Sequence, residues 1–251
     1  MNTPSEATVK KLRLIAFGAF AVPFVFSICS YFLSMIGFAP SEWMSDMDAS
    51  VYKYFIGMLS AGTTLMAYTI LSILATNRTT GTLMRNVGIA LAAIGIVKTL
   101  FYFFYTGEGW TNIGISLINT AFYLVPTLII FYMLGTLERN NPNCLQTKKA
   151  ALIIFWIGFI IPLFLTQAVI ALCIEYLTIY YLYLITMDCL VLYGYYLLCH
   201  SEAFSGRTDN SPAPKGAYKV WNKYYNYFLL SILIMVVVVI VHFIITETLL
   251  K

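Results

Sequence analysis

Charged side chains are scarce in this 251-residue sequence, in which Asp, Glu, Lys and Arg together make up 10% of the residues. Soluble globular proteins contain about 25% of these residues. Hydrophobic residues make up 60%, more than the roughly 45–50% of a typical soluble chain. A soluble fold of this length could not bury so much apolar surface. The composition therefore excludes soluble domains, nucleic-acid-binding proteins and disordered chains, and it predicts a polytopic membrane protein.

Cysteine and histidine are too few and too scattered to build a disulfide framework or a metal site. The five cysteines are odd in number and show no Cys-x-x-Cys spacing, and most fall in apolar segments, where cysteine packs as a small hydrophobic residue. The two histidines, His200 and His242, are expected near opposite faces of the membrane. No HExxH, GxSxG or phosphate-loop motif is present. We therefore expect no enzyme activity, no catalytic residue, no metal and no cofactor.

Long apolar runs take the place of the missing charge. A helix that crosses the hydrocarbon core needs about 20 apolar residues, and seven segments meet this requirement. They are continuously apolar, without the two-residue alternation of a membrane β-barrel. The sequence thus predicts an all-α bundle of seven transmembrane helices in a single domain, 1–251. The predicted spans are 14–35, 54–76, 86–105, 112–134, 150–173, 178–198 and 226–245.

Basic residues fall almost entirely on one side of these spans. The N-terminus and the even-numbered loops contain Lys10, Lys11, Arg13, Arg78, Arg85, Arg139, Lys148, Lys149, Arg207, Lys215, Lys219 and Lys223. The opposite side has only Lys53 and Lys251. Because Lys and Arg concentrate in cytoplasmic loops, we expect a cytoplasmic N-terminus and an external C-terminus. The chain is expected in the cell inner or plasma membrane as a multi-pass protein.

The first and last three spans share a sequence pattern. Pro23 and Pro162 both lie near the middle of a span that follows a lysine pair, and the Ile-Val-Lys ending at Lys98 matches the Ile-Val-His ending at His242. These matches are compatible with a parallel repeat of three spans, about 14–105 and 150–246, with 112–135 as the linking helix. Chance similarity between apolar segments is the alternative.

Small residues follow a helical spacing in the third predicted span. Gly88, Ala92 and Gly95 recur three or four positions apart, so they fall on one face of a helix. Residues without a large side chain let the backbones of two membrane helices approach closely. This face is predicted to pack directly against a neighbouring helix.

Two charged residues, Lys98 and Asp188, lie well inside predicted spans. A charge within the bilayer costs about 2.5–3.5 kcal/mol on insertion scales, so it is usually paired or functional. Counted along their helices, the two side chains differ in depth by roughly 5 Å. A Lys98–Asp188 ion pair is therefore predicted, either as part of a site or as a structural clamp between helices. The alternative is that Lys98 extends outward to the membrane surface and Asp188 is protonated.

Five polar residues from five different spans all fall in the predicted outer half of the membrane. We predict that they line a polar vestibule that opens to the outside and binds a small molecule or ion, with Asp188 as the cation or proton site. The alternative is a set of scattered polar contacts that hold helices together. The five candidate ligand-binding residues are Lys98, Asn119, Gln167, Asp188 and His242.

Two functions remain open on this sequence. The first is a membrane-embedded carrier or binding protein for a small molecule or ion. The second is a non-catalytic membrane subunit or regulator that acts through helix contacts with a partner protein. A signalling sensor is disfavoured because the C-terminus is expected outside. The partners implied are the lipid bilayer, the small ligand, and a membrane protein or a second copy of this chain, but no nucleic acid.

Overall fold

The computed structural model describes residues 5–36, 46–104, 113–161 and 177–206. Within these ranges the chain forms helices joined by short turns and contains no strand, so the all-α prediction is confirmed. The helices are α1 (Glu6–Met35), α3 (Asp46–Leu74), α4 (Arg78–Phe104), α5 (Ile113–Asn140), α6 (Leu145–Phe155) and α8 (Leu177–Cys199). A π-helical turn, η1 (Trp156–Ile160), continues α6, and a 3₁₀ turn, η2 (Glu202–Phe204), follows α8.

Five of these helices are long and apolar enough to cross a membrane. They contain the candidate spans Glu6–Met35, Tyr54–Leu74, Arg78–Tyr102, Leu117–Asn140 and Thr178–Cys199, which match five of the seven predicted segments. The predicted span 150–173 begins as α6 and η1 and continues outside the described residues, where the whole of 226–245 also lies. The chain is a multi-pass membrane protein, and the count of seven stays a prediction.

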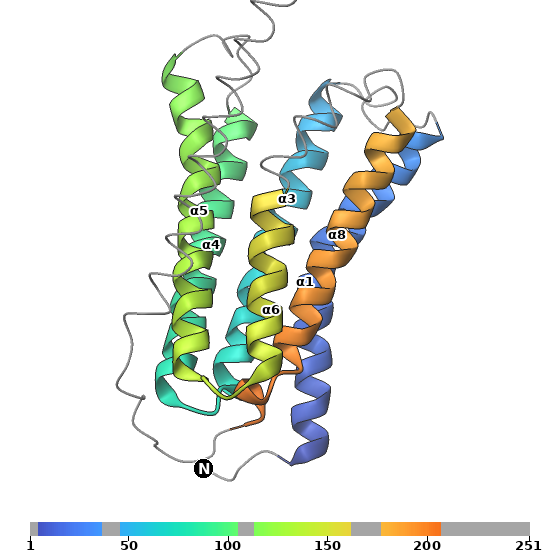
Figure 1. Ribbon diagram of the computed structural model, residues 1–251. Helices are drawn as coiled ribbons and strands as arrows, with labels where there is room; N and C mark the ends of the chain where they lie inside the picture. Colours follow the sequence, from blue (N-terminus) through green and yellow to red (C-terminus); the bar gives the residue numbers. More distant parts are fainter. Residues whose placement is uncertain (1–4, 37–45, 105–112, 162–176, 207–251) are drawn as a thin grey trace, which may run out of the picture.

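Successive helices alternate in direction (Figure 1). The start of α1, the α3–α4 turn, the α5–α6 turn and the end of α8 therefore lie at the same end of the bundle. We call it the basic end, because it carries Lys10, Lys11, Arg13, Arg78, Arg85, Arg139, Lys148 and Lys149.

The helices extend beyond the predicted spans at the basic end. Helix α1 begins at Glu6 rather than at residue 14, and the Ser5 hydroxyl caps it by accepting a hydrogen bond from the Thr8 backbone N–H at 3.3 Å. Helix α4 begins at Arg78 rather than at residue 86. Hydropathy registers only the apolar part of a helix, whereas its backbone hydrogen bonds continue about two further turns through basic and polar residues.

Each helix of the bundle packs against two or more neighbouring helices. Helices α3 and α4 make the most extensive contact, α1 packs against both α3 and α8, and α8 packs against α6. Helix α5 contacts α4 on its other side. In Figure 1, α4 and α5 consequently stand at one side of the bundle and α1 and α8 at the other.

Glycines set the close approach of α3 and α4. A Cβ atom built on Gly88 would lie 2.5 Å from Tyr68 Cβ, and one on Gly95 would lie 3.3 Å from Ala61 Cβ. Ala92, between them on the same face, is buried. Only a residue without a Cβ fits at position 88 without moving the neighbouring helix. The prediction that this face packs against another helix is confirmed.

Tight packing is concentrated in the half of the bundle nearer the basic end. The largest fully buried side chains in the described ranges all lie in that half: Tyr68, Leu71, Leu74, Met84, Met133, Leu134, Leu137, Ile154, Phe155, Leu198 and Phe204. The two polar regions described below lie at the middle of the bundle and in its opposite half. The core of the described residues therefore lies in the half of the bundle nearer the basic end.

Candidate functional site

Residues 201–206 fold back under the helix ends and close the basic end, and we call this segment the plug. The Phe204 side chain is fully buried. The Thr76 backbone N–H donates to the Ala203 carbonyl at 3.0 Å, and the Gly206 N–H donates to the Leu74 carbonyl at 2.9 Å. Gly206 has a φ of 96°, a conformation that residues with a Cβ rarely adopt. The plug is therefore bound to the end of α3 by its backbone.

Arg13 joins the plug to α1. Its Nε donates to the Phe204 carbonyl at 3.1 Å, and its Nη2 donates to the Ser201 carbonyl at 3.0 Å. A guanidinium with several donors in one plane suits such a two-carbonyl contact. From the sequence, Arg13 was only one of many orientation markers, because no motif distinguishes an arginine that caps a distant turn.

Ser201 joins the plug to α6. The hydroxyls of Ser201 and Thr147 are 2.8 Å apart, and the Cys144 thiol donates to Ser201 Oγ at 3.6 Å. Burial raises the pKa of Cys144, but hydrogen bonds that its thiolate would accept from Thr147, from Ser201 and from the Glu202 backbone outweigh burial and hold this pKa below its usual value. Residues from α1, from the end of α3 and from the start of α6 thus converge on the plug.

Lys98 and Asn119 come together at the contact between α4 and α5. Lys98 Nζ lies 4.6 Å from the centre of the Tyr123 ring and 6.0 Å from that of Tyr102. The Tyr102 hydroxyl donates to Asn119 Oδ1 at 2.6 Å. An ammonium group is attracted to the face of an aromatic ring, so two tyrosines stabilise Lys98 in the half of the bundle opposite the basic end.

Asp188 lies at the middle of α8, on the face that packs against α1. An aromatic seam defines this face: Phe20 stacks on Tyr195 at 4.5 Å between ring centres, and Tyr31 stacks on Tyr181 at 6.0 Å. Asp188 comes between these two pairs along the helix. Its side chain is therefore held between α1 and α8.

The carboxylate of Asp188 is only partly satisfied. The Ser27 hydroxyl of α1 is within hydrogen-bonding reach of the carboxyl group. The other oxygen, Oδ2, is buried and has no hydrogen-bond partner among the residues that the structure describes. Tyr31 is close enough to interact electrostatically with both Asp188 and Tyr180. The result is a half-buried acidic group beside the Ser27 hydroxyl and the Tyr31 side chain.

The structure does not bring Lys98 and Asp188 together. Lys98 lies on α4, which packs against α3 and α5, whereas Asp188 lies on α8, which packs against α1 and α6. No ion pair joins them in the part of the chain that the structure describes, and the predicted pair is absent there. Position along a helix sets depth, but it does not say which helices are neighbours.

The remaining predicted ligand residues, Gln167 and His242, lie outside the described residues. The described part of the chain therefore contains two separate polar regions, one around Lys98 and Asn119 and one around Asp188. It also contains no group of three His, Cys, Asp or Glu residues that could hold a metal ion. A single vestibule that joins all five residues stays a prediction.

Comparison with known proteins adds no family to this description. No protein-family model, no curated protein and no solved structure matches the chain. The function must therefore be inferred from the chemistry of the site alone.

Proposed function

We propose that this protein is a non-catalytic, membrane-embedded carrier or binding protein for a small cation, with Asp188 as the cation or proton site. The observation that carries the proposal is the buried Oδ2 of Asp188, which has no partner among the described residues. Keeping a carboxylate inside a membrane helix costs about 2.5–3.5 kcal/mol. Since Lys98 lies on another helix pair, this cost is offset when a cation or a proton binds.

The surroundings of Asp188 favour an organic ammonium group over a metal ion. Calcium and magnesium need six or more oxygen ligands, whereas the described neighbours of Asp188 supply one hydroxyl, Ser27, and the side chain of Tyr31. An ammonium ion can form a salt bridge with the carboxylate and lie against aromatic faces at the same time. A compact organic amine is therefore the ligand class that fits.

Access is proposed from the side opposite the basic end. The excess of Lys and Arg supports a cytoplasmic basic end, which gives the seven-span chain an external C-terminus. The plug and the tightly packed half then separate Asp188 from the cytoplasm. The polar region around Lys98 and Asn119 lies on the external half, where predicted spans five and seven would add Gln167 and His242.

The test is the response of the purified protein in lipid nanodiscs to choline, with sodium chloride at equal ionic strength as reference. We expect choline to raise the melting temperature of the wild type. It should not change the melting temperature of Asp188→Asn, because this substitution keeps the shape of the side chain but removes its charge. Thr186→Val is the matched control, because Thr186 is exposed on the same helix and its hydroxyl donates only to the Leu182 carbonyl of that helix. An equal choline response in Asp188→Asn and Thr186→Val would contradict the proposal.

A further inference from the structure

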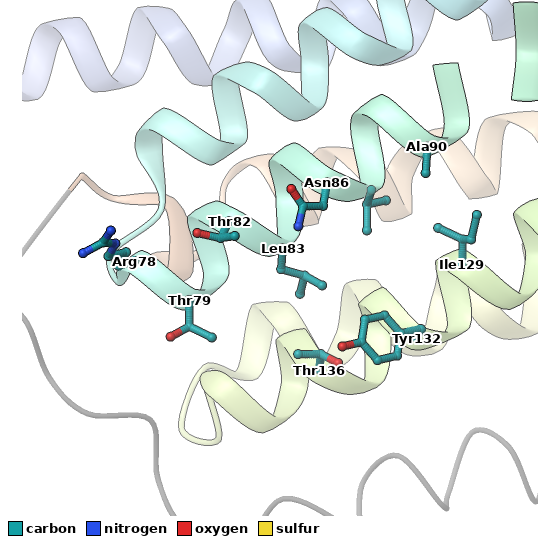
Figure 2. A pocket seen from close by; sticks show the side chains of 10 residues that line it. Arg78, Thr79, Thr82, Leu83, Asn86, Ala90, Ile129, Tyr132 and Thr136 are labelled. Carbon is teal, nitrogen blue, oxygen red and sulfur yellow. The ribbon is translucent and has the colours of Figure 1, made fainter. Parts of the chain in front are cut away.

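A cavity lies away from Asp188, in the half of the bundle near the basic end. It has a volume of about 610 Å³ and is lined by the first half of α4 and the second half of α5. Figure 2 shows side chains of the two helices facing one another across it, with Arg78 at one end and Ala90 and Ile129 at the other. Because α4 and α5 do not contact the Asp188 carboxylate, this cavity is independent of the proposed cation site.

Polar groups line the end of the cavity nearer the α3–α4 turn. They are the side chains of Arg78, Thr79, Thr82, Asn86 and Thr136. None of these side chains forms a hydrogen bond to another residue in the described part of the chain. Tyr132 also lines the cavity. The five other polar residues offer one guanidinium, one amide and three hydroxyls to a ligand, and the guanidinium is the only charged group in the lining.

Apolar groups line the deeper end. Val87, Ala90 and Ile129 leave a surface of methyl and methylene groups there. From Arg78 to Ala90 the helix rises by roughly 18 Å, which takes it from the polar flank into the apolar span predicted to begin at residue 86. Arg78 then lies on the headgroup side of the membrane boundary, and the apolar end of the cavity lies just inside the hydrocarbon. The cavity is thus polar and basic at headgroup depth and apolar at acyl-chain depth.

We infer that this cavity binds one anionic phospholipid. The phosphate accepts hydrogen bonds from Arg78 and from the threonine hydroxyls, and one acyl chain lies along Val87, Ala90 and Ile129. An arginine is the residue best suited to a phosphate, because its donors match two oxygens at once. A free phosphate ion would leave the apolar end of the cavity unfilled.

A lipid also matches this cavity better than the chain's own predicted last span does. The segment 226–245 consists largely of Leu, Ile and Val, so its side chains offer almost no acceptor for the five polar groups. Donors that face hydrocarbon without a partner are costly, whereas a lipid headgroup brings several acceptor oxygens to the same depth.

The experiment measures lipid retained by the purified full-length protein, using native mass spectrometry after exchange into detergent with phosphatidylglycerol or phosphatidylcholine. We expect one tightly held phosphatidylglycerol and no comparable phosphatidylcholine. Arg78→Gln should weaken retention about tenfold, since it removes the charge-assisted contact. Arg85→Gln is the matched control, because Arg85 is exposed on the same helix but does not line the cavity. Equal retention in the two variants, or equal retention of both lipids, would overturn the inference.

Two further experiments test the other possible occupants of the cavity, which are a free phosphate ion and the chain's own segment 226–245. Inorganic phosphate added to lipid-free protein should not raise its melting temperature. A rise that Arg78→Gln abolishes would identify a soluble-anion site instead of a lipid site. A photoreactive residue at Ala90 should crosslink to a lipid and add the mass of one lipid. An internal crosslink to 226–245 without added mass would show that the chain itself fills the cavity, and would also overturn the inference.

Discussion

Replacing Arg13 by Gln should loosen the plug at the basic end. The arginine donates two charge-assisted hydrogen bonds, at 3.1 Å to the Phe204 carbonyl and at 3.0 Å to the Ser201 carbonyl. Such a bond contributes about 1.5–3 kcal/mol, and the lower value applies because Arg13 is only half-buried. Loss of both bonds therefore costs about 3 kcal/mol, which corresponds to an increase of about a hundredfold in the population with the plug open.

The two cysteines beneath the plug report this opening. Cys144 and Cys199 are buried, so a maleimide should label them only when the plug opens. The measurement uses protein in which Cys29, Cys173 and Cys189 are replaced by serine, and it follows the labelling rate in nanodiscs. Arg13→Gln should raise the rate by one to two orders of magnitude, consistent with the hundredfold population change.

The control substitutions for the labelling rate are made in the same helix as Arg13. Lys10→Gln removes an exposed basic residue less than one turn from Arg13, and it should leave the labelling rate unchanged. Arg13→Lys retains the charge but loses the planar pair of donors, so its rate should lie between those of the wild type and Arg13→Gln. If Arg13→Gln labels no faster than Lys10→Gln, the plug does not depend on this arginine.

Two further predictions concern packing and topology. Gly88→Ala should lower the melting temperature, because its Cβ would meet Tyr68 Cβ at 2.5 Å and overpacking costs about 1–3 kcal/mol. Gly62→Ala is the control and should not lower it, because a Cβ there meets nothing within 4 Å. Equal shifts in the two variants would contradict the glycine-mediated contact of α3 and α4. A reporter that is active only in the cytoplasm should work when inserted near Ser211 and be silent when fused after Lys251, and an active fusion at Lys251 would rule out the seven-span orientation.

The comparison of Lys98 with Asp188 shows where inference from sequence stops. Both residues were identified correctly as charges inside membrane helices, because hydropathy along the chain shows directly where a charge interrupts an apolar run. Their depths were compatible with a pair as well. The pair is absent because α4 packs against α3 and α5, whereas α8 packs against α1 and α6. The periodicity of one helix does not show which helix its face will contact.

Some parts of the candidate sites had a signal in the sequence and others had none. The spacing of Gly88, Ala92 and Gly95 predicted a close helix contact, because a stripe of small residues has a local physical cause. The contact of Arg13 with Ser201 and Phe204 joins residues nearly two hundred positions apart. Nothing in either short segment indicates the other, so only the folded chain could reveal the plug.

The sequence by itself determined the membrane environment, the helical class and the five spans that the structure describes, because each depends on the composition of one continuous segment. The tertiary structure decided which helices are neighbours, that the basic end is closed by residues 201–206, and that Asp188 faces Ser27 rather than Lys98. These features depend on contacts between distant segments, and such contacts form only when all the helices pack together.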